Sequence, residues 1–145
     1  QNPIDRRFHA QPNACPDCGP QLQLTDATGE NVATNNIIEK TVSLLKQGKI
    51  IAIKGIGGFH LACLASVEST VVALRERKHR KHKPFALMAR DVSMVKQYCL
   101  VSDQEEYLLT DRVSPIVLLT KANDLLATQV APKQKSLGFM LPYSP

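Results

Sequence analysis

Two cysteines near the start of the chain have the spacing of a metal-binding pair. Cys15 and Cys18 lie three positions apart, and a Gly-Pro turn follows them. Two thiolates at this spacing can bind one Zn²⁺ ion, and His9 is a candidate third ligand. A redox-active pair is the alternative, but the usual strand-then-helix context is missing. We therefore predict a structural zinc site that contains Cys15 and Cys18 and is completed by ligands upstream.

A glycine-rich stretch follows an apolar run at residues 49–54. Residues 54–60 read Lys-Gly-Ile-Gly-Gly-Phe-His. This stretch is not a P-loop, because no Gly-Lys-Ser/Thr follows, and it is not a Rossmann loop, because His60 stands where the third glycine belongs. The glycines would allow a ligand to approach backbone N–H groups closely. A plain tight turn explains them equally well.

The segment from Arg75 to Lys83 carries the net charge of the chain. Six of its nine residues are Lys or Arg and one is Glu76, so its local charge of +5 equals the net charge of all 145 residues. Lys78, Arg80 and Lys83 could bind the phosphates of one nucleotide, with arginine as a fork and lysine as a point charge. The run lacks the interleaved aromatic residues of single-strand nucleic-acid sites. A solvated helix end is the alternative.

The composition narrows the class of protein. The chain is 43% hydrophobic and 21% charged, which is typical of one globular domain. It has no run of about 18 apolar residues, and residues 1–7 are polar, so we expect neither a membrane span nor a signal peptide. We predict a cytoplasmic protein. Cys63 and Cys99 stand singly in apolar surroundings and are predicted to be small buried side chains.

Helices and strands alternate irregularly after a proline-rich start. We predict helices at residues 36–47, from Ser66 into the basic segment, at 91–98, and from Ser102 with a capping box to Glu105. Strands are expected at 49–54, 59–64, 85–89, 116–120 and 137–141, with the first and fourth buried. The irregular spacing predicts an α/β or α+β domain with a mixed sheet at residues 34–145. Residues 1–33 are predicted to form a small separate module.

Several blocks of sequence, in order, resemble the HypF family of carbamoyltransferases, which mature nickel-iron hydrogenases. The blocks are Asp5–Pro12, Cys15–Pro20, Ile53–Cys63, Leu74–Arg80, Lys83–Ala86, Pro115–Leu118 and Gly138–Pro142. The resemblance implies that residues 1 to about 24 end a tandem zinc-finger segment whose last pair is Cys15 and Cys18. It also implies that residues from about 35 onward form the first part of a YrdC-like domain, a twisted mixed sheet with helices that binds ATP.

The resemblance also implies a reaction. In the family, the YrdC-like domain converts ATP and carbamate, released from carbamoyl phosphate, into carbamoyl-adenylate and pyrophosphate. The carbamoyl group then passes to the C-terminal cysteine of the partner HypE and becomes the cyanide ligand of the hydrogenase. The implied site residues are Lys78 and Arg80 for catalysis and nucleotide binding, Lys83 for nucleotide binding with Mg²⁺ present, and Lys54, Gly57, Gly58 and His60 for the small substrate.

Two departures from the family pattern affect these expectations. Leu64 stands where relatives often have aspartate, and the Ser-x-Asn nucleotide motif of the domain would lie beyond Pro145. We therefore expect a fragment with an incomplete ATP site. One alternative is a YrdC-type threonylcarbamoyl-AMP synthase of tRNA modification, although those enzymes normally lack a preceding zinc finger. The other is a double-stranded RNA-binding module.

Overall fold

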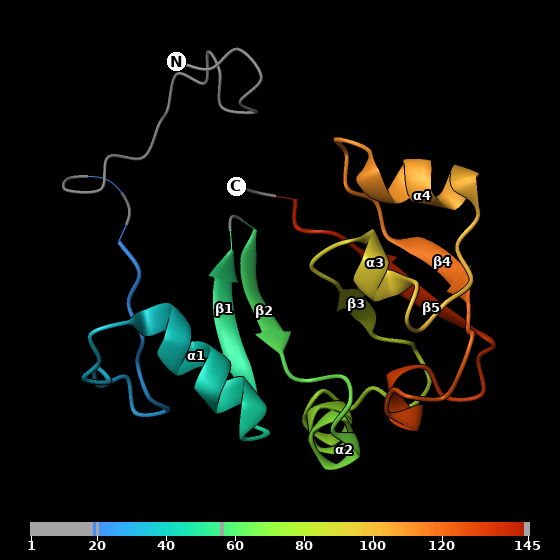
Figure 1. Ribbon diagram of the computed structural model, residues 1–145. Coiled ribbons are helices and arrows are strands. Elements are labelled where there is room, and N and C mark those ends of the chain that lie inside the picture. Colours follow the sequence, from blue (N-terminus) through green and yellow to red (C-terminus); the bar gives the residue numbers. More distant parts are fainter. Residues whose placement is uncertain (1–18, 20, 56, 144–145) are drawn as a thin grey trace, which may run out of the picture. The chain divides into compact units, whose positions relative to one another are not determined.

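The computed structural model describes residues 19, 21–55 and 57–143 (Figure 1). The chain divides into two compact units, Gln1–Val42 and Ser43–Pro145, and the division lies inside the first helix. The described part of the first unit contains a turn closed by an antiparallel bridge between Thr25 and Asn31. The Asp26 carboxylate caps this turn by accepting from the Thr28 hydroxyl and N–H, and these hydrogen bonds lower the pKa of Asp26.

Helix α1 spans Ile37–Lys46 and has the two end signals expected from the sequence. The Asn36 side chain accepts from the N–H of Glu39 at 3.1 Å, so Asn36 is the N-cap. Gly48 follows the helix with φ of +75°, and the N–H of Lys49 donates to the Leu44 carbonyl at 3.0 Å. This geometry is a Schellman motif, in which glycine accepts the left-handed conformation without a steric cost.

Strands β1 (Ile51–Gly55) and β2 (Gly58–Ala62) form an antiparallel hairpin that closes at the pair Gly55–Gly58. The prediction that the first strand is buried is wrong, because no described residue of this hairpin is buried and Ile53 is 46% exposed. The two strands pair only with each other among the described strands. An apolar strand can be buried only where another element covers it, and the strand's own sequence does not show that.

A second, mixed sheet has the strand order β3-β5-β4, which confirms the predicted sheet type. Strand β3 (Ala86–Met88) runs parallel to β5 (Ser136–Met140), and β4 (Val117–Thr120) runs antiparallel to β5. The expectation of a fully buried fourth strand is half correct, because Val117 and Leu119 are buried whereas Leu118 is 72% exposed. Successive side chains point to opposite faces of a strand, and only one face of this sheet faces the core.

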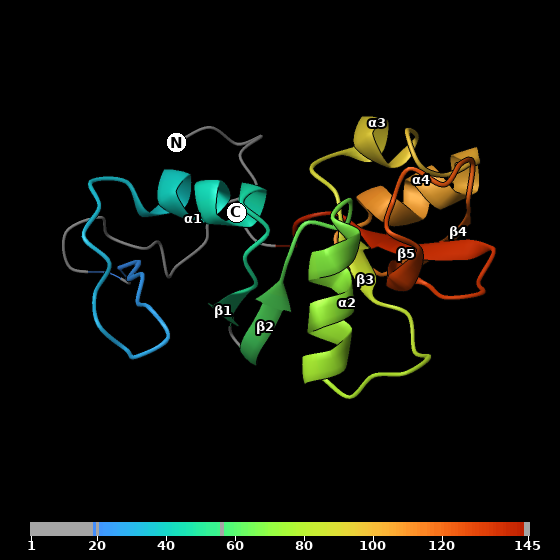
Figure 2. The same cartoon turned by 90° about the horizontal axis from the view of Figure 1, so that it is seen from below.

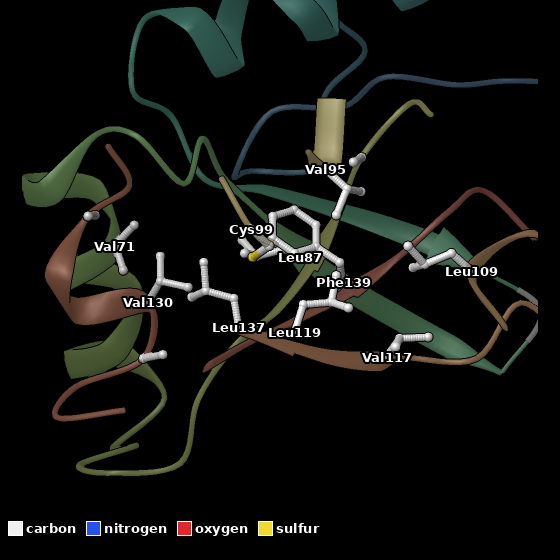
Figure 3. Close-up of a cluster of buried hydrophobic side chains, with 13 residues drawn as sticks. Val71, Leu87, Val95, Cys99, Leu109, Val117, Leu119, Val130, Leu137 and Phe139 are labelled. Atoms are coloured by element: carbon white, nitrogen blue, oxygen red, sulfur yellow. The ribbon is translucent and has the colours of Figure 1, made fainter. Parts of the chain in front are cut away.

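The core lies between that sheet face and the helices α2, α3 and α4 (Figures 1 and 2). Helix α2 spans Glu68–Arg77, α3 spans Val92–Val95, α4 spans Asp103–Thr110, and a 3₁₀ turn, η1, spans Thr128–Val130. Figure 3 shows the buried side chains that these elements share. They include Val71, Leu87, Val95, Cys99, Leu109, Leu119, Val130, Leu137 and Phe139.

The helix starts agree with the sequence in two places and differ in one. Asp91 caps α3, and Ser102 and Glu105 form the predicted capping box of α4. Helix α2 begins one residue later than expected, with Val67 as its N-cap and no side-chain cap from Ser66. Helix α3 is shorter than predicted, since turns replace its last residues before Tyr98.

Candidate functional site

The C-terminal end of α2 sets the positions of the central cations. Lys78 is the C-cap, and His79 follows it in the left-handed conformation with φ of +49°. The N–H of Arg80 donates to the Arg75 carbonyl and the N–H of His79 donates to the Glu76 carbonyl, both at 3.0 Å. These bonds complete a second Schellman motif, with histidine in the usual place of glycine. Lys78 and Arg80 therefore lie on either side of the sharp turn that ends the helix.

Lys78 and Arg80 lie at the partly negative end of the α2 dipole. The carbonyl end of a helix carries a partial negative charge, which stabilises positive side chains near it and repels anions. A phosphate group at this position therefore depends on side-chain cations rather than on the helix itself. The exposed cations of the segment are Arg77, Lys78, Lys81 and Lys83.

Arg75 belongs to the basic segment in sequence, but the structure buries it at 8% exposure. Its guanidinium donates to backbone carbonyls on two sides. The Nε atom bonds the Gln129 carbonyl at 3.0 Å, and Nη1 bonds the Arg80 carbonyl at 2.6 Å. Burial, followed by the charge of Arg80, lowers the pKa of Arg75. The exposed charge of the segment is therefore smaller than its sequence indicates.

Arg80 is half-buried and is partly held by its own loop. Its Nε donates to the Lys83 carbonyl at 2.9 Å, and its Nη2 donates to the carbonyl of Pro84. The Arg80 guanidinium carbon also lies 5.1 Å from the ring centroid of Phe85. Its Nη1 has no partner among the described residues, so part of the arginine fork is available to a ligand. The Lys78 ammonium group has no hydrogen-bond or ion-pair partner there either.

Helix α2 also holds η1 at both ends. Near its start, the Glu68 carboxylate accepts from the N–H and hydroxyl of Thr128 at 2.6 and 2.9 Å. Two turns later, Arg75 donates to the carbonyls of Gln129 and Val130. Sequence reasoning missed both contacts. Their signal was the seven-residue spacing, which places Glu68 and Arg75 on the same helix face as Val71.

The hairpin separates two residues that the resemblance assigned to one substrate. Lys54 pairs with Phe59, and its ammonium nitrogen lies 5.3 Å from that ring centroid. His60 pairs with Ile53, one position along the strand, so its side chain leaves the opposite face. The imidazole lies over Gly55, where an added Cβ would come within 3.0 Å of it. A small ligand on one face of this hairpin contacts Lys54 or His60, but not both.

Gly57 and Gly58 lie at the turn of the same hairpin. Gly58 has φ of +129°, a conformation that favours glycine, and a Cβ at either position would meet no atom within 4 Å. The backbone at this turn is therefore open to close approach. In the part of the chain that the structure describes, no hydrogen bond, ion pair or ring contact joins the hairpin to residues 78–84.

Two surface hollows lie in the described part of the chain. One of about 230 Å³ is lined by residues that include Lys121, Thr128 and Lys133, and one of about 340 Å³ is lined by residues that include Lys49 and Arg77. Neither hollow includes Lys78, Arg80 or Lys83. Lys78 and Lys83 are exposed in the described structure, whereas Arg80 is half-buried.

The predicted zinc ligands Cys15 and Cys18, with the candidate His9, lie outside the described residues. Within residues 19, 21–55 and 57–143, no three His, Cys, Asp or Glu side chains lie close enough together to bind a metal ion. Over the same residues, every helix is too short or too polar to cross a membrane. Cys99 is 2% exposed, as predicted, whereas Cys63 is half-buried against the core.

Family models match both parts of the chain. Residues 43–145 match the Sua5, YciO and YrdC family, which is described as "Telomere recombination", and residues 1–25 match the "HypF finger". Carbamoyltransferase HypF of Rhodobacter capsulatus is 48% identical over the whole chain, and HypF2 of Cupriavidus necator is 49% identical over 126 residues, 86% of the chain. The chain spans 19% and 16% of the lengths of these two relatives.

Two solved structures share the fold. A full-length HypF in its phosphate- and nucleotide-bound form is 50% identical with a TM-score of 0.82, and HypF of T. kodakarensis is 43% identical with a TM-score of 0.87. Each likeness covers 99% of this chain and 19% of the solved chain. The chain therefore belongs to the Sua5, YciO and YrdC family, whose model matches residues 43–145, and along its whole length it is similar to HypF carbamoyltransferases.

Proposed function

We propose that this chain takes part in a HypF-type carbamoyltransferase and forms part of its ATP-dependent adenylating site. Lys78, Arg80 and Lys83, at and just after the end of α2, carry the proposal, because they lie within the segment that matches the YrdC-like family. A HypF relative with 50% identity has been solved with phosphate and nucleotide bound. The nucleotide bound to that relative supports a nucleotide site in a HypF-type protein, and we propose that residues 78–83 of this chain contribute to such a site.

Lys78, Arg80 and Lys83 are the proposed nucleotide-binding residues. The free ammonium group of Lys78 supplies a point charge to a phosphate oxygen, and the available Nη1 of Arg80 supplies a directed pair of donors. Lys83 is exposed on the same loop. Mg²⁺ would accompany the nucleotide and share its phosphate oxygens.

The proposed reaction has three steps. Water first cleaves carbamoyl phosphate into carbamate and phosphate. A carbamate oxygen then attacks the α-phosphorus of ATP, the bond from this phosphorus to the bridging oxygen breaks, and carbamoyl-adenylate and pyrophosphate form. Negative charge grows on the α-phosphate oxygens in that second step, and Lys78 and Arg80 are proposed to stabilise it. In the third step the thiolate of the C-terminal cysteine of a HypE-type acceptor attacks the carbamoyl carbon, the bond from this carbon to the adenylate oxygen breaks, and AMP leaves.

The hairpin is the proposed wall for the small substrate. The open backbone at Gly57 and Gly58 would donate N–H groups to a carbamoyl or phosphate oxygen. Lys54 and His60 remain proposed substrate residues, but the pairing register allows only one of them to face the same ligand. Cys15 and Cys18 are proposed to bind a structural zinc ion. We place the protein in the cytoplasm, with weak double-stranded RNA binding as a secondary property of the YrdC-like fold.

Substrate choice tests this proposal. Pyrophosphate release from ATP is measured with the full-length protein, once with carbamoyl phosphate and once with threonine plus bicarbonate. Release that depends on carbamoyl phosphate supports the proposal. Release only with threonine and bicarbonate would instead identify a threonylcarbamoyl-AMP synthase, the activity that the Sua5, YciO and YrdC match makes the second candidate.

The RNA alternative is tested separately by salt dependence. Tight binding of double-stranded RNA that weakens steeply with salt would indicate a dedicated RNA-binding module. Weak binding that does not depend on RNA length is the result expected for an adenylating enzyme.

A further inference from the structure

The guanidinium of Arg75 has no donor left for a ligand. Its five N–H groups match five hydrogen bonds to four backbone carbonyls. The bonds run from Nε to Gln129 (3.0 Å), from Nη1 to Arg80 (2.6 Å) and Lys83 (3.3 Å), and from Nη2 to Gln129 (2.5 Å) and Val130 (3.4 Å). No carboxylate pairs with Arg75 within the described residues. Arg75 is therefore unsuited to bind phosphate directly, although it belongs to the basic segment.

Those four carbonyls belong to two segments far apart in sequence. Two come from η1 and two come from residues 80–83, which carry two of the three proposed nucleotide-binding cations, Arg80 and Lys83. The backbone of Phe85 adds a direct link between the segments, because its N–H donates to the Val130 carbonyl at 2.9 Å. The buried guanidinium of Arg75 thus joins α2, η1 and the loop at residues 80–83.

The ring of Phe85 connects Arg75 to Arg80. The guanidinium carbons of Arg75 and Arg80 lie 4.6 and 5.1 Å from its centroid. Two like charges near one ring repel each other, and the attraction of each cation to the ring offsets part of that cost. The orientation of Arg80 therefore depends on the place of Phe85 and on the loop carbonyls, and Arg75 holds both segments in register.

We propose that Arg75 is a positioning residue, which fixes the loop so that Lys78, Arg80 and Lys83 are held ready for the nucleotide phosphates. The inference rests on the proposed function of the loop. Only arginine suits this role, because its planar fork has five donors in fixed directions. A lysine keeps the charge but has three donors on one nitrogen, so it cannot reach the carbonyls of η1 and of the loop together.

The test compares the same chemical change at two neighbouring arginines. Arg75→Lys changes the buried guanidinium that binds η1 and residues 80–83. Arg77→Lys is the matched control, because Arg77 is exposed in the same helical turn and its side chain donates no hydrogen bond within the described residues. The dissociation constant of Mg-ATP is measured by calorimetry in the full-length protein, together with the thermal midpoint of each variant. Both variants keep the net charge, so long-range electrostatics stays constant.

We expect Arg75→Lys to weaken ATP binding by between about 10- and 100-fold, while Arg77→Lys binds like the wild type. We also expect the effects of Arg75→Lys and Arg80→Ala on ATP affinity to be non-additive, because one acts through the other. A stabilising residue without a positioning role would change the thermal midpoint but leave the affinity of the folded protein unaltered.

Failure of the proposed function and failure of the inference about Arg75 give different results. Wild-type protein that does not bind ATP would overturn the proposed function and this inference with it. Wild-type binding that Arg75→Lys leaves unchanged, or that Arg77→Lys weakens equally, would overturn the inference alone. Should Arg75→Lys not fold, Phe85→Leu removes the ring that both guanidiniums share, and an unchanged ATP affinity in that variant would be equally decisive against it.

Discussion

At the scale of single residues, burial divides the basic segment into two kinds of cation. The guanidinium N–H groups of Arg75 all donate to backbone carbonyls, whereas only some of those of Arg80 donate to carbonyls of its own loop. Lys78 has no partner in the described structure. A lysine on the open surface can approach a ligand without first breaking a contact, so Lys78 is the residue whose removal affects binding with the least change to the loop.

His79 provides a prediction about stability. Its φ of +49° costs a residue with a Cβ about 1 kcal/mol or more, and glycine avoids this cost. We expect His79→Gly to raise the free energy of unfolding by about 1 kcal/mol, measured by chemical denaturation. Lys81→Gly is the control, because Lys81 does not have a positive φ, and it should give no gain. A destabilised His79→Gly variant would mean that the imidazole makes a contact worth more than the strain.

Cys99 provides a prediction about pH. Burial raises the pKa of the Cys99 thiol to about 11 from an ordinary value of 9.0. Between these two values the unfolded chain has lost the proton and the folded chain has kept it. The stability due to the protonated thiol is therefore complete below pH 9 and falls by roughly 1.4 kcal/mol per pH unit as the pH rises towards 11.

The measurement compares the wild type with Cys99→Ala in denaturant at pH values from 8 to 11. Other groups titrate in the same range, but they do so in both proteins and cancel in the difference. We expect the stability advantage of the wild type to shrink above pH 9. A difference that stays constant across the range would show that the thiol titrates alike in the folded and unfolded chains.

At the scale of elements, α2 organises the candidate site by binding η1 at both ends. Glu68 accepts from the N–H groups of Thr128 and Gln129, while Arg75 donates to carbonyls at the other end of the same turn. A carboxylate on N–H groups and a guanidinium on carbonyls both complement the dipole of the short turn. The loop that follows α2 is thus fixed against a segment more than forty residues away in sequence.

Replacing Glu68 tests this arrangement. We expect Glu68→Ala to lower the free energy of unfolding by about 1 kcal/mol, the usual cost of a lost capping side chain. Glu76→Ala is the matched control on the same helix, because the Glu76 carboxylate has no hydrogen-bond or ion-pair partner among the described residues. It should change stability by less than about 0.5 kcal/mol. Equal effects from the two substitutions would argue against a specific cap on η1.

The sequence predicts these elements well where the signal is local. Asn36 and Gly48 mark the ends of α1, and the capping box of α4 follows from Ser102 and Glu105, because each of these signals acts within one helical turn. The exposure of Ile53 and the burial of Arg75 could not be predicted from such local signals. Both depend on which distant segment lies against the residue, and only the tertiary structure shows that.

At the scale of the whole molecule, the family match and the basic loop give one account of function. The YrdC-like family match spans residues 43–145, and two solved HypF structures are similar to this chain over 99% of its length. The co-linear motifs predicted the family, and the irregular spacing of helices and strands predicted the mixed sheet. The roles of Lys78, Arg80 and Lys83 in ATP binding remain proposals, and so does the contribution of the hairpin to the substrate site.

ATP-dependent pyrophosphate release with carbamoyl phosphate tests the central claim most directly. The full-length protein with Lys78→Ala and Arg80→Ala is compared with one that carries Arg77→Ala and Lys81→Ala, so that both lose two positive charges from the same region. We predict that the first variant loses pyrophosphate release while remaining folded, and that the second keeps most of it. Normal release from the Lys78→Ala and Arg80→Ala protein would contradict the assignment of the adenylating site to this loop.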